Sequence, residues 1–342
     1  MRAITLIPGT TELTLQVLPE PMISAADEVK IKTLQVGICG TDREQAAGGR
    51  AIAPTGREEI VIGHELFGQV IETGRAVQTV KPGDYAMFTV RRGCGKCRAC
   101  IYGRSDMCFT GNYTERGIKG ADGFQAEYVV DKERYVVKIP SAIKDIGVLT
   151  EPMSVAAKAI DEALAIQAAR LGDFENGANW FAGKRTLIAG IGPIGLMAAF
   201  ALRLRGANVI GMDIVDDNTL RPSLLRSIGG IYSDGRKLDV HEQDDLFGQI
   251  DFIFEATGVA SLQIQLIDTL GINGIYVATG IPEGERPMRV QAGSLMQQLV
   301  LKNQVVLGSV NAGIQHYRMA VKYLEESKRR WSKLYGDRKS VV

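Results

Sequence analysis

Four cysteines lie close together in the chain, at Cys94, Cys97, Cys100 and Cys108. Thiolates two residues apart wrap one metal ion and a more distant fourth closes the tetrahedron, so this spacing predicts a four-thiolate zinc site. A closed shell leaves no position for a substrate, which makes the predicted role structural, in a lobe at about residues 91–110. The alternative is an iron–sulfur cluster, but a ferredoxin run has three residues before its fourth cysteine and this chain has seven.

A second set of possible metal ligands is spread along the chain. Cys39 lies in a glycine-flanked turn, His64 and Glu65 follow one another directly, and Glu151 precedes a proline. Thiolate, imidazole and carboxylate together suit a catalytic zinc ion with one open coordination position. Spacing alone leaves open whether these residues meet, because a lone cysteine or histidine is more often a packed core residue.

The segment 190–195, Gly-Ile-Gly-Pro-Ile-Gly, matches the G-x-G-x-x-G pattern of dinucleotide-binding turns. It follows a short apolar run and precedes an Ala/Leu-rich segment with helical periodicity, so the predicted helix presents free N–H groups to a pyrophosphate. An acid, Asp213, ends the next predicted strand, where a carboxylate accepts a hydrogen bond from the ribose 2′-hydroxyl and favours NAD over NADP. The predicted cofactor-binding residues are Gly190, Gly192, Pro193, Ile194, Gly195, Asp213, Thr257 and Gly258.

These residues need two kinds of domain to position them. Up to about residue 150, short apolar runs alternate with Gly and Pro turns, which predicts a barrel-like β domain. From residue 153, strands alternate with helices, which predicts an α/β domain with a doubly wound parallel sheet. We expect a catalytic domain over 1–152, a nucleotide-binding domain over 153–307 and a return segment over 308–342. The elements expected in the second half are strands 185–189, 208–213, 250–255 and 274–278, a helix over 196–205, and two successive helices over 154–164 and up to 170.

The overall composition excludes some partners. The 342 residues carry 40 Lys and Arg against 39 Asp and Glu, a net charge of +1, which argues against nucleic acid or an anionic membrane as a partner. The N-terminus lacks the apolar run of a signal peptide, and no apolar stretch is long enough to span a membrane, so we expect a soluble cytoplasmic protein. The basic run after residue 328 alternates with apolar residues and predicts a solvated helix face.

The chain resembles the medium-chain, zinc-containing alcohol dehydrogenases from end to end. The resemblance rests on segments 37–42 and 63–65, the cysteine lobe and the turn at 190–195. It implies a GroES-like β-barrel catalytic domain joined to a Rossmann domain. It also implies a catalytic zinc ion, which in the branch described next is held by Cys39, His64 and sometimes Glu65, with Glu151 binding directly or through water.

Within that family the chain is similar to the archaeal glucose (aldose) dehydrogenase branch. The similarity rests on segments 91–95, 115–118 with 122–124, and 308–311. It implies that the sugar contacts Thr41, Glu115, Glu151 and Asn311. Val90 and Val155 stand where the branch often has Asn and Asp, so a sugar with fewer hydroxyls is expected to fit better than glucose. The family usually continues further at the C-terminus, so the return segment is expected to be incomplete.

The implied reaction transfers a hydride from a hydroxyl-bearing carbon to C4 of the nicotinamide, with zinc as the Lewis acid and Thr41 as proton relay. Oxidation at the anomeric carbon of an aldose gives a lactone. One alternative is a polyol or secondary-alcohol dehydrogenase with the same machinery. Another is a non-catalytic binding protein, against which the intact metal-ligand set argues. The family also implies homodimers or homotetramers, with residues 305–310 as a candidate edge strand.

Overall fold

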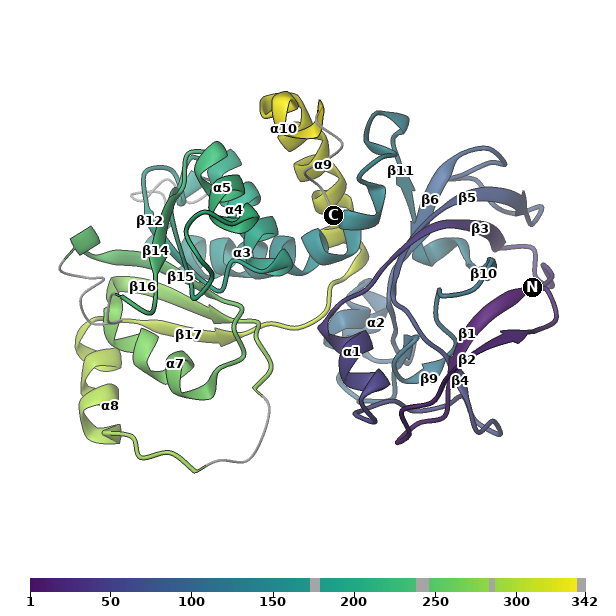
Figure 1. Cartoon of the computed structure of the whole chain (residues 1–342), viewed down its shortest axis with the longest axis horizontal. Helices are drawn as coiled ribbons and strands as arrows, with labels where there is room; N and C mark the ends of the chain where they lie inside the picture. The colour runs from purple at the N-terminus through teal and green to yellow at the C-terminus, as the bar shows by residue number, and fades with distance from the viewer. Residues whose placement is uncertain (173–178, 238–245, 283–286, 337–342) are drawn as a thin grey trace. The chain divides into compact units, whose positions relative to one another are not determined.

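The computed structural model describes residues 1–172, 179–237, 246–282 and 287–336 (Figure 1). The chain forms two compact units. The first comprises Met1–Ser154 and Asn311–Glu325, and the second comprises Val155–Val310 together with the residues from Glu326 onward. None of the described helices is long and apolar enough to cross a membrane.

The first unit is built mainly from β-strands. Its main sheet has five strands in the order β10-β3-β5-β6-β11, all paired antiparallel. Two three-stranded sheets, β2-β1-β4 and β7-β8-β9, complete it. The strands are β1 (Arg2–Leu6), β2 (Leu13–Val17), β3 (Glu28–Gly37), β4 (Ile60–Val61), β5 (Glu65–Thr73), β6 (Tyr85–Phe88), β7 (Arg91–Arg92), β8 (Thr114–Arg116), β9 (Gly120–Ala121), β10 (Tyr128–Lys132) and β11 (Val136–Ile139).

Strands β3 and β5 set the geometry of this unit. Apolar side chains such as Ile31 on β3 and Leu66 and Val70 on β5 are buried, which fixes the register of the pair. In that register the last residue of β3, Gly37, lies opposite Glu65, the first residue of β5. The short helices α1 (Gly40–Ala46) and α2 (Arg98–Ile101) and the 3-10 turn η1 (Ser105–Met107) belong to the same unit. The register therefore places the turn at Cys39, which follows β3, next to the start of β5.

The second unit is a parallel α/β domain. Its six strands lie in the order β14-β13-β12-β15-β16-β17, and every neighbouring pair is parallel. The order reverses between β12 and β15, which is where doubly wound sheets bind ligands. The strands are β12 (Arg185–Ala189), β13 (Asn208–Asp213), β14 (Ile231–Asp234), β15 (Ile250–Glu255), β16 (Leu270–Ala278) and β17 (Val305–Gly308). The helices are α4 (Pro193–Leu204), α5 (Leu220–Ser227), α7 (Ala260–Gln265) and α8 (Ala292–Leu301).

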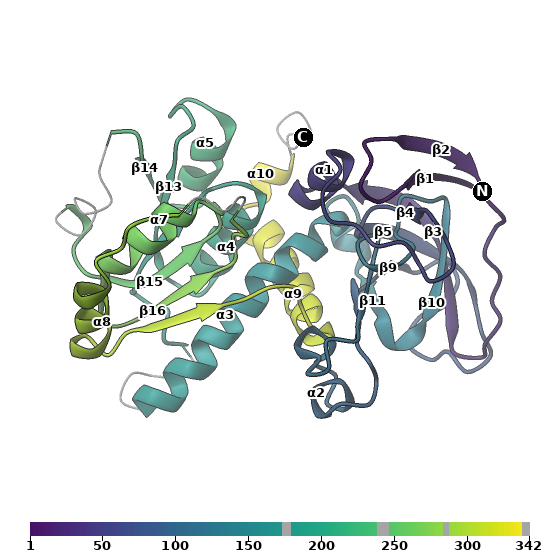
Figure 2. The ribbon, with the colours of Figure 1, turned by 90° about the horizontal axis from the view of Figure 1, so that it is seen from below.

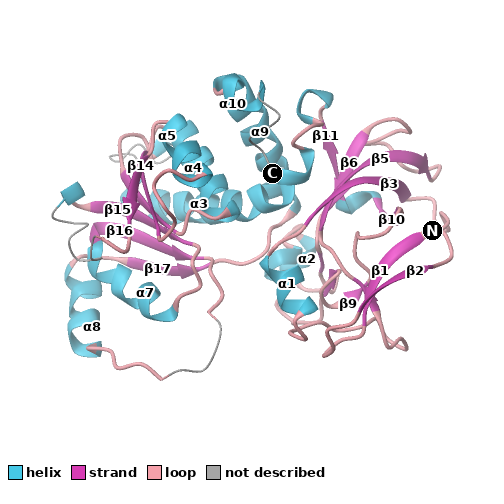
Figure 3. Ribbon diagram, in the orientation of Figure 1, coloured by secondary structure: helices cyan, strands magenta, loops and turns pink. Residues whose placement is uncertain are grey.

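Helices cover both faces of this sheet. Helices α4 and α5 lie on one face and α7 and α8 on the other (Figures 2 and 3). The strands are apolar because both faces are buried, and Leu187, Ile210 and Ile253 form part of one continuous core. Leu295 and Leu299 of α8 pack against that core. The strands predicted at 185–189, 208–213 and 250–255 are confirmed, and β16 begins four residues before the predicted 274.

Three further α-helices, α3, α9 and α10, complete the α-helices of the described residues. The prediction of two successive helices after residue 153 is wrong, because α3 runs unbroken over Thr150–Leu171, a stretch of 22 residues. Its sequence after Pro152 contains neither Gly nor Pro and is rich in Ala, so nothing interrupts the hydrogen-bond ladder. Helix α9 (Ile314–Arg330) carries part of the basic run. A short helix, α10 (Ser332–Gly336), follows it.

Candidate active site and metal centres

Cys39 is held by the start of helix α1. It is the N-cap residue, and its Sγ accepts a hydrogen bond from the backbone N–H of Thr41 at 3.2 Å. In return, the carboxylate of Asp42 accepts a hydrogen bond from the backbone N–H of Cys39 at 2.8 Å. Such a reciprocal capping box fixes the thiol at the helix terminus. Burial, together with the charge of Asp42, raises the pKa of this thiol to about 11.

His64 approaches the same thiol from the turn before β5. Its Nε2 lies 3.0 Å from the Cys39 Sγ, and only 6% of the residue is exposed. On the other side of the ring, Nδ1 lies 3.6 Å from the Asp42 Oδ1. Both of these atoms are buried and have no hydrogen-bond partner among the described residues. The His64 ring therefore lies between Asp42, next to its Nδ1, and the Cys39 thiol, next to its Nε2. A carboxylate in this position orients metal-binding histidines.

Glu65 adds a buried carboxylate to the pair. Burial raises its pKa, and its carboxylate fills the space that a side chain at position 37 would occupy. A Cβ on Gly37 would lie 1.8 Å from the Glu65 Oε2. Ligand atoms of Cys39, His64 and Glu65 all lie within 4.8 Å of one another. The glycine at the end of β3 is thus a requirement of the site.

Glu151 lies in the first turn of α3 and stands slightly apart. It is buried, and its carboxylate is not within the 4.8 Å group formed by Cys39, His64 and Glu65. Burial raises its pKa to about 8, and the nearby charge of Glu65 acts in the same direction. Tyr317 of α9 is buried beside it, and the Tyr317 hydroxyl accepts a hydrogen bond from the Val90 backbone N–H at 3.3 Å.

These residues fit a divalent cation. A thiol and two carboxyl groups are buried together, and in each the pKa is raised because burial disfavours the charged form. A cation bound among them reverses that penalty, since it stabilises thiolate and carboxylate alike. The unpartnered His64 Nδ1 and Asp42 Oδ1 form the second layer such a site needs. Sulfur, nitrogen and oxygen donors with three protein ligands are typical of catalytic zinc.

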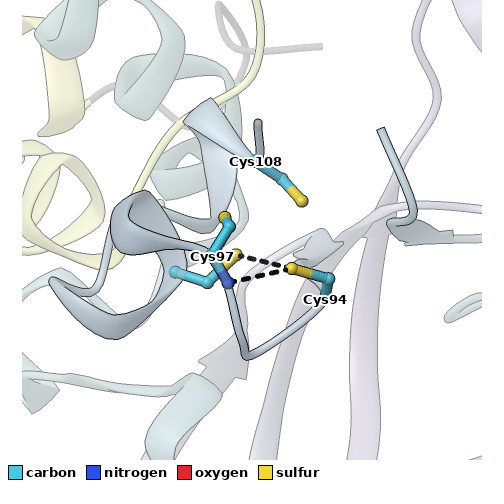
Figure 4. A group of neighbouring side chains, drawn as sticks. Cys94, Cys97 and Cys108 are labelled. Carbon is cyan, nitrogen blue, oxygen red and sulfur yellow. Dashed lines mark hydrogen bonds between the residues drawn. The ribbon is translucent and has the colours of Figure 1, made fainter. Parts of the chain in front are cut away.

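The cysteine lobe forms a separate centre around α2 and η1 (Figure 4). One sulfur from each of the four predicted ligands lies within 4.8 Å of the others. The Cys94 Sγ accepts a hydrogen bond from the Cys97 backbone N–H at 3.3 Å and lies 3.9 Å from the Cys100 Sγ. A tetrahedron with Zn–S of about 2.3 Å places sulfurs roughly 3.8 Å apart, whereas a disulfide requires about 2.05 Å. The lobe therefore fits zinc and contains no disulfide.

Next to this lobe, two residues predicted to bind sugar contact each other. The Asn311 Nδ2 donates a hydrogen bond to the Glu115 Oε1 at 2.7 Å. Asn311 adopts a left-handed backbone conformation with φ of 62°, which Asn tolerates better than most residues. The turn after β8 also reaches the metal-ligand turn, because a Cβ on Gly117 would lie 2.2 Å from the Gly63 carbonyl oxygen. Glu115 and His64 thus belong to adjoining segments of one unit.

The second unit contains the predicted dinucleotide turn. Gly190 has φ of 86°, and a Cβ on Gly195 would lie 1.9 Å from the Gly190 carbonyl oxygen, so neither position accepts a larger residue. A Cβ on Gly192 would meet no atom within 4 Å. Gly192 is the N-cap of α4, and Pro193 occupies the first turn. The backbone at Gly192 is therefore free to approach a phosphate at a helix N-terminus.

Two acids end the strands that flank this turn. The Asp213 carboxylate accepts hydrogen bonds from the Ile191 backbone N–H at 2.9 Å and from the Ile214 backbone N–H at 2.7 Å. The carboxylate of Glu255, which is fully buried, accepts hydrogen bonds from the backbone N–H groups of Thr257 at 2.6 Å and Gly258 at 3.0 Å. Thr257 and Gly258 are thereby fixed at the end of β15, beside the first glycine of the turn.

Comparison with known proteins agrees with this geometry. Residues 25–141 match the alcohol dehydrogenase GroES-like domain, and residues 144–337 match the glucose dehydrogenase C-terminus. The chain belongs to the medium-chain alcohol dehydrogenase family, in its glucose dehydrogenase branch. The family resemblance and the two-part fold predicted from the sequence are thus confirmed.

Individual relatives cover nearly the whole chain. The chain is 38% identical to glucose 1-dehydrogenase of Thermoproteus tenax over 96% of its own length and 88% of the relative. It is 34% identical to glucose 1-dehydrogenase of Methanocella arvoryzae over 97% of its length and 90% of the relative. Glucose dehydrogenase of Haloferax mediterranei, solved in complex with NADP, Zn and gluconolactone, superposes with a TM-score of 0.87 at 30% identity, covering 97% of this chain and 91% of that one.

The structure also brings in residues that the sequence analysis did not assign to the site. Asp42 was part of a matching segment, but its contact with His64 was not predicted. Glu255 organises the loop at Thr257, and Arg91 holds Glu115. Only Asp42 had a sequence signal, because an acid three residues after an N-cap is the spacing of a capping box.

Proposed function

We propose that this chain is a zinc-dependent dehydrogenase that transfers a hydride from the anomeric carbon of an aldose to a nicotinamide cofactor, giving a lactone. The observation that supports it most directly is the buried group of Cys39, His64 and Glu65, with Glu115 and Asn311 on an adjoining strand and loop of the same unit. The Haloferax mediterranei relative is solved with NADP, Zn and gluconolactone, which supports the same reaction class.

We assign a role to each candidate site residue of the first unit. Cys39, His64 and Glu65 hold the zinc ion, and Glu151 completes the set directly or through water. When bound, zinc supplies Lewis-acid chemistry that favours the deprotonated form of a hydroxyl group. Glu115 and Asn311 bind and orient the sugar hydroxyls, and the Thr41 hydroxyl relays the proton that leaves the reacting oxygen, giving up its own proton as it accepts that one. The four cysteines of the lobe hold a second, structural zinc ion.

The cofactor is proposed to bind at Gly190–Gly195, with NAD preferred and NADP accepted. Asp213 places a carboxylate at the end of β13, where it favours a ribose hydroxyl over a phosphate. The Arg221 Nη1 lies 3.8 Å from the Asp213 Oδ2. Its positive charge lessens the repulsion between this carboxylate and the 2′-phosphate of NADP. The test is a comparison of kcat/KM with the two cofactors, and a higher value with NADP would contradict the role given to Asp213.

The substrate test is a panel of aldoses, deoxy aldoses, polyols and simple secondary alcohols. A site that binds hydroxyls through buried polar groups discriminates by up to about 10⁴ against analogues that lack them. Val90 is buried and apolar, so we expect a deoxy aldose or one with fewer hydroxyls to rank first. If secondary alcohols or polyols have the highest kcat/KM, the aldose assignment fails and the alternative of a polyol or secondary-alcohol dehydrogenase replaces it.

We further propose a homodimer or homotetramer that joins at β17. This strand is the last of its sheet, and α8 beside it exposes Met296, Val300 and Leu301. Light scattering that finds only monomers at micromolar concentration would contradict this.

We also propose a cytoplasmic location. All five cysteines are unbridged, which supports a reducing compartment.

A further inference from the structure

Arg91 lies between the cysteine lobe and the proposed sugar-binding residues. It belongs to β7, which enters the lobe, and its cross-strand partner on β8 is Glu115. The Arg91 and Glu115 side chains are only 9% and 13% exposed. Residues directly opposite in an antiparallel pair project to the same face, so this pairing follows from the backbone register.

The guanidinium group of Arg91 is fixed on three sides. Its Nε and Nη2 donate hydrogen bonds to the Glu115 Oε1 at 3.1 Å and 2.9 Å. Its Nη1 donates to the backbone carbonyl of Asp106 at 2.8 Å, two residues before Cys108. The ring of Tyr113 stacks on it with 4.0 Å from the Arg91 Cζ to the ring centroid. One planar cation therefore joins the carboxylate of Glu115 to the backbone of the metal lobe.

The two oxygens of the Glu115 carboxylate have different surroundings. Oε1 accepts both bonds from Arg91 and the bond from the Asn311 Nδ2. Oε2 accepts no hydrogen bond from the described residues of the chain. The carboxylate is thus held by one oxygen, while the other remains an acceptor for a hydroxyl group. Asn311 is held by the same oxygen, so both residues depend on the position of this carboxylate.

The lobe segment at Asp106, to which Arg91 donates a hydrogen bond, is held in place by further contacts. The Asp106 side chain is fully buried and accepts hydrogen bonds from Arg104, with the shortest, from the Arg104 Nη2, at 2.8 Å. A Cβ on Gly313, two residues after Asn311, would lie 2.7 Å from the Asp106 Oδ1. The segments at 91, 106, 115 and 311–313 therefore form a closed ring of contacts. A shift of the lobe moves Arg91 and, with it, the acceptor oxygen of Glu115.

We propose that Arg91 is a positioning residue through which the cysteine lobe sets the affinity for the aldose. This rests on the proposed function, because it assumes that Glu115 binds a sugar hydroxyl. The role requires arginine: a lysine at this position keeps the charge but loses the planar fork that reaches Glu115 and Asp106 at once. The four-cysteine centre, built as a structural site, thereby also takes part in substrate recognition.

The test compares Arg91→Met and Arg91→Lys with the control Arg98→Met, which removes an exposed arginine from the same lobe. For the aldose that the wild type prefers, Arg91→Met is expected to raise KM about 10- to 100-fold, the size of one hydrogen bond to a charged group, with a smaller change in kcat. Arg91→Lys is expected to fall between Arg91→Met and the wild type, and Arg98→Met to match the wild type. Aldose binding measured by calorimetry should weaken by the same factor, whereas the NAD Kd and the metal content should not change.

A double-mutant cycle separates positioning from general damage. In a Glu115→Gln background, the further change Arg91→Met is expected to alter KM by less than about twofold, because the group that Arg91 positions has already been altered. Additive effects, or a wild-type KM in Arg91→Met, would overturn the proposal while leaving the proposed function intact. If the wild type oxidises no aldose, the proposed function itself fails, and the proposal for Arg91 fails with it.

Discussion

The two candidate metal centres differ in how the chain assembles them. The four cysteines of the lobe come from residues 94–108 and are joined by a short helix and turns. The buried centre takes its groups from the starts of α1, β5 and α3, and Cys39 and Glu151 are 112 positions apart (151 − 39). The first centre therefore needs only local structure, whereas the second needs the barrel register. We expect loss of the first to damage stability and loss of the second to damage chemistry.

The largest expected effect is on chemistry. Cys39→Ser should lower kcat/KM by on the order of 10³ or more, because a catalytic metal supplies several kcal/mol of transition-state stabilisation. The fold should remain, since serine also accepts hydrogen bonds at an N-cap. Steady-state kinetics, a thermal melt and metal analysis check this, with two zinc ions per chain expected in the wild type and one in the variant. Retention of a tenth of the activity would contradict the role of Cys39.

The matching substitution in the lobe should lower the stability of the fold first, rather than the rate of the reaction. Cys97→Ser removes one of four thiolates from a centre whose metal binding contributes directly to folding. A loss of about 3 kcal/mol would lower Tm by roughly 6–12 °C in a unit of this size. Calorimetry and metal analysis on the same preparation test it. A variant that melts like the wild type and keeps two zinc ions would show that the lobe does not depend on its metal.

This contrast also explains what the sequence could predict. The lobe is encoded by spacing alone, so Cys94 to Cys108 were assigned without any family resemblance. The glycine turn at 190–195 is equally local and follows a recognisable strand. Cys39, His64 and Glu151 are far apart in sequence, and their types alone left open whether they meet. The family resemblance supplied that step, since spacing gives no information about the register of β3 against β5.

Two other features were not predicted, for different reasons. No sequence pattern links Arg91 to Glu115, and only the pairing of β7 with β8 brings the two side chains together. Cross-strand partners depend on tertiary packing, which periodicity in one sequence does not record. The prediction of two helices where α3 is single was avoidable, because no helix-breaking residue follows Pro152.

A glycine pair sharpens the comparison within the buried centre. Gly37→Ala places a Cβ 1.8 Å from the Glu65 Oε2, so the carboxylate must move and the site is overpacked at a cost of about 1–3 kcal/mol. Gly40→Ala, on the other side of Cys39, meets no atom within 4 Å and serves as the control. We expect Gly37→Ala to lower zinc affinity about 10- to 100-fold and Gly40→Ala to leave it unchanged. Equal zinc affinities in competition with a chelator would contradict the role of Gly37.

The smallest expected effect concerns the attachment of the lobe to the barrel. Arg92, next to Arg91, donates to the Asp131 carboxylate on β10 with Nη2 to Oδ2 at 2.8 Å, and its guanidinium lies 4.0 Å from the Tyr135 ring centroid. Burial alone would raise the pKa of Asp131, but the charges of Arg92 and Arg116 outweigh it and lower the pKa below its ordinary value. This ion pair joins the base of the lobe to the main sheet.

The sign of the resulting pH dependence follows from that lowered pKa. A carboxyl whose pKa is depressed by folding contributes its full stabilisation above the unfolded pKa of about 3.9, and the contribution is lost as pH falls through the folded value. The difference in urea midpoint between the wild type and Asp131→Asn should therefore stay constant from pH 7 to 5 and shrink below about pH 4. Glu72→Gln, at an exposed carboxylate on β5 of the same sheet, is the control for general acid effects. A difference that already shrinks between pH 7 and 5 would mean that Asp131 is not held ionised by its arginines, and that the lobe is attached to the barrel by other contacts.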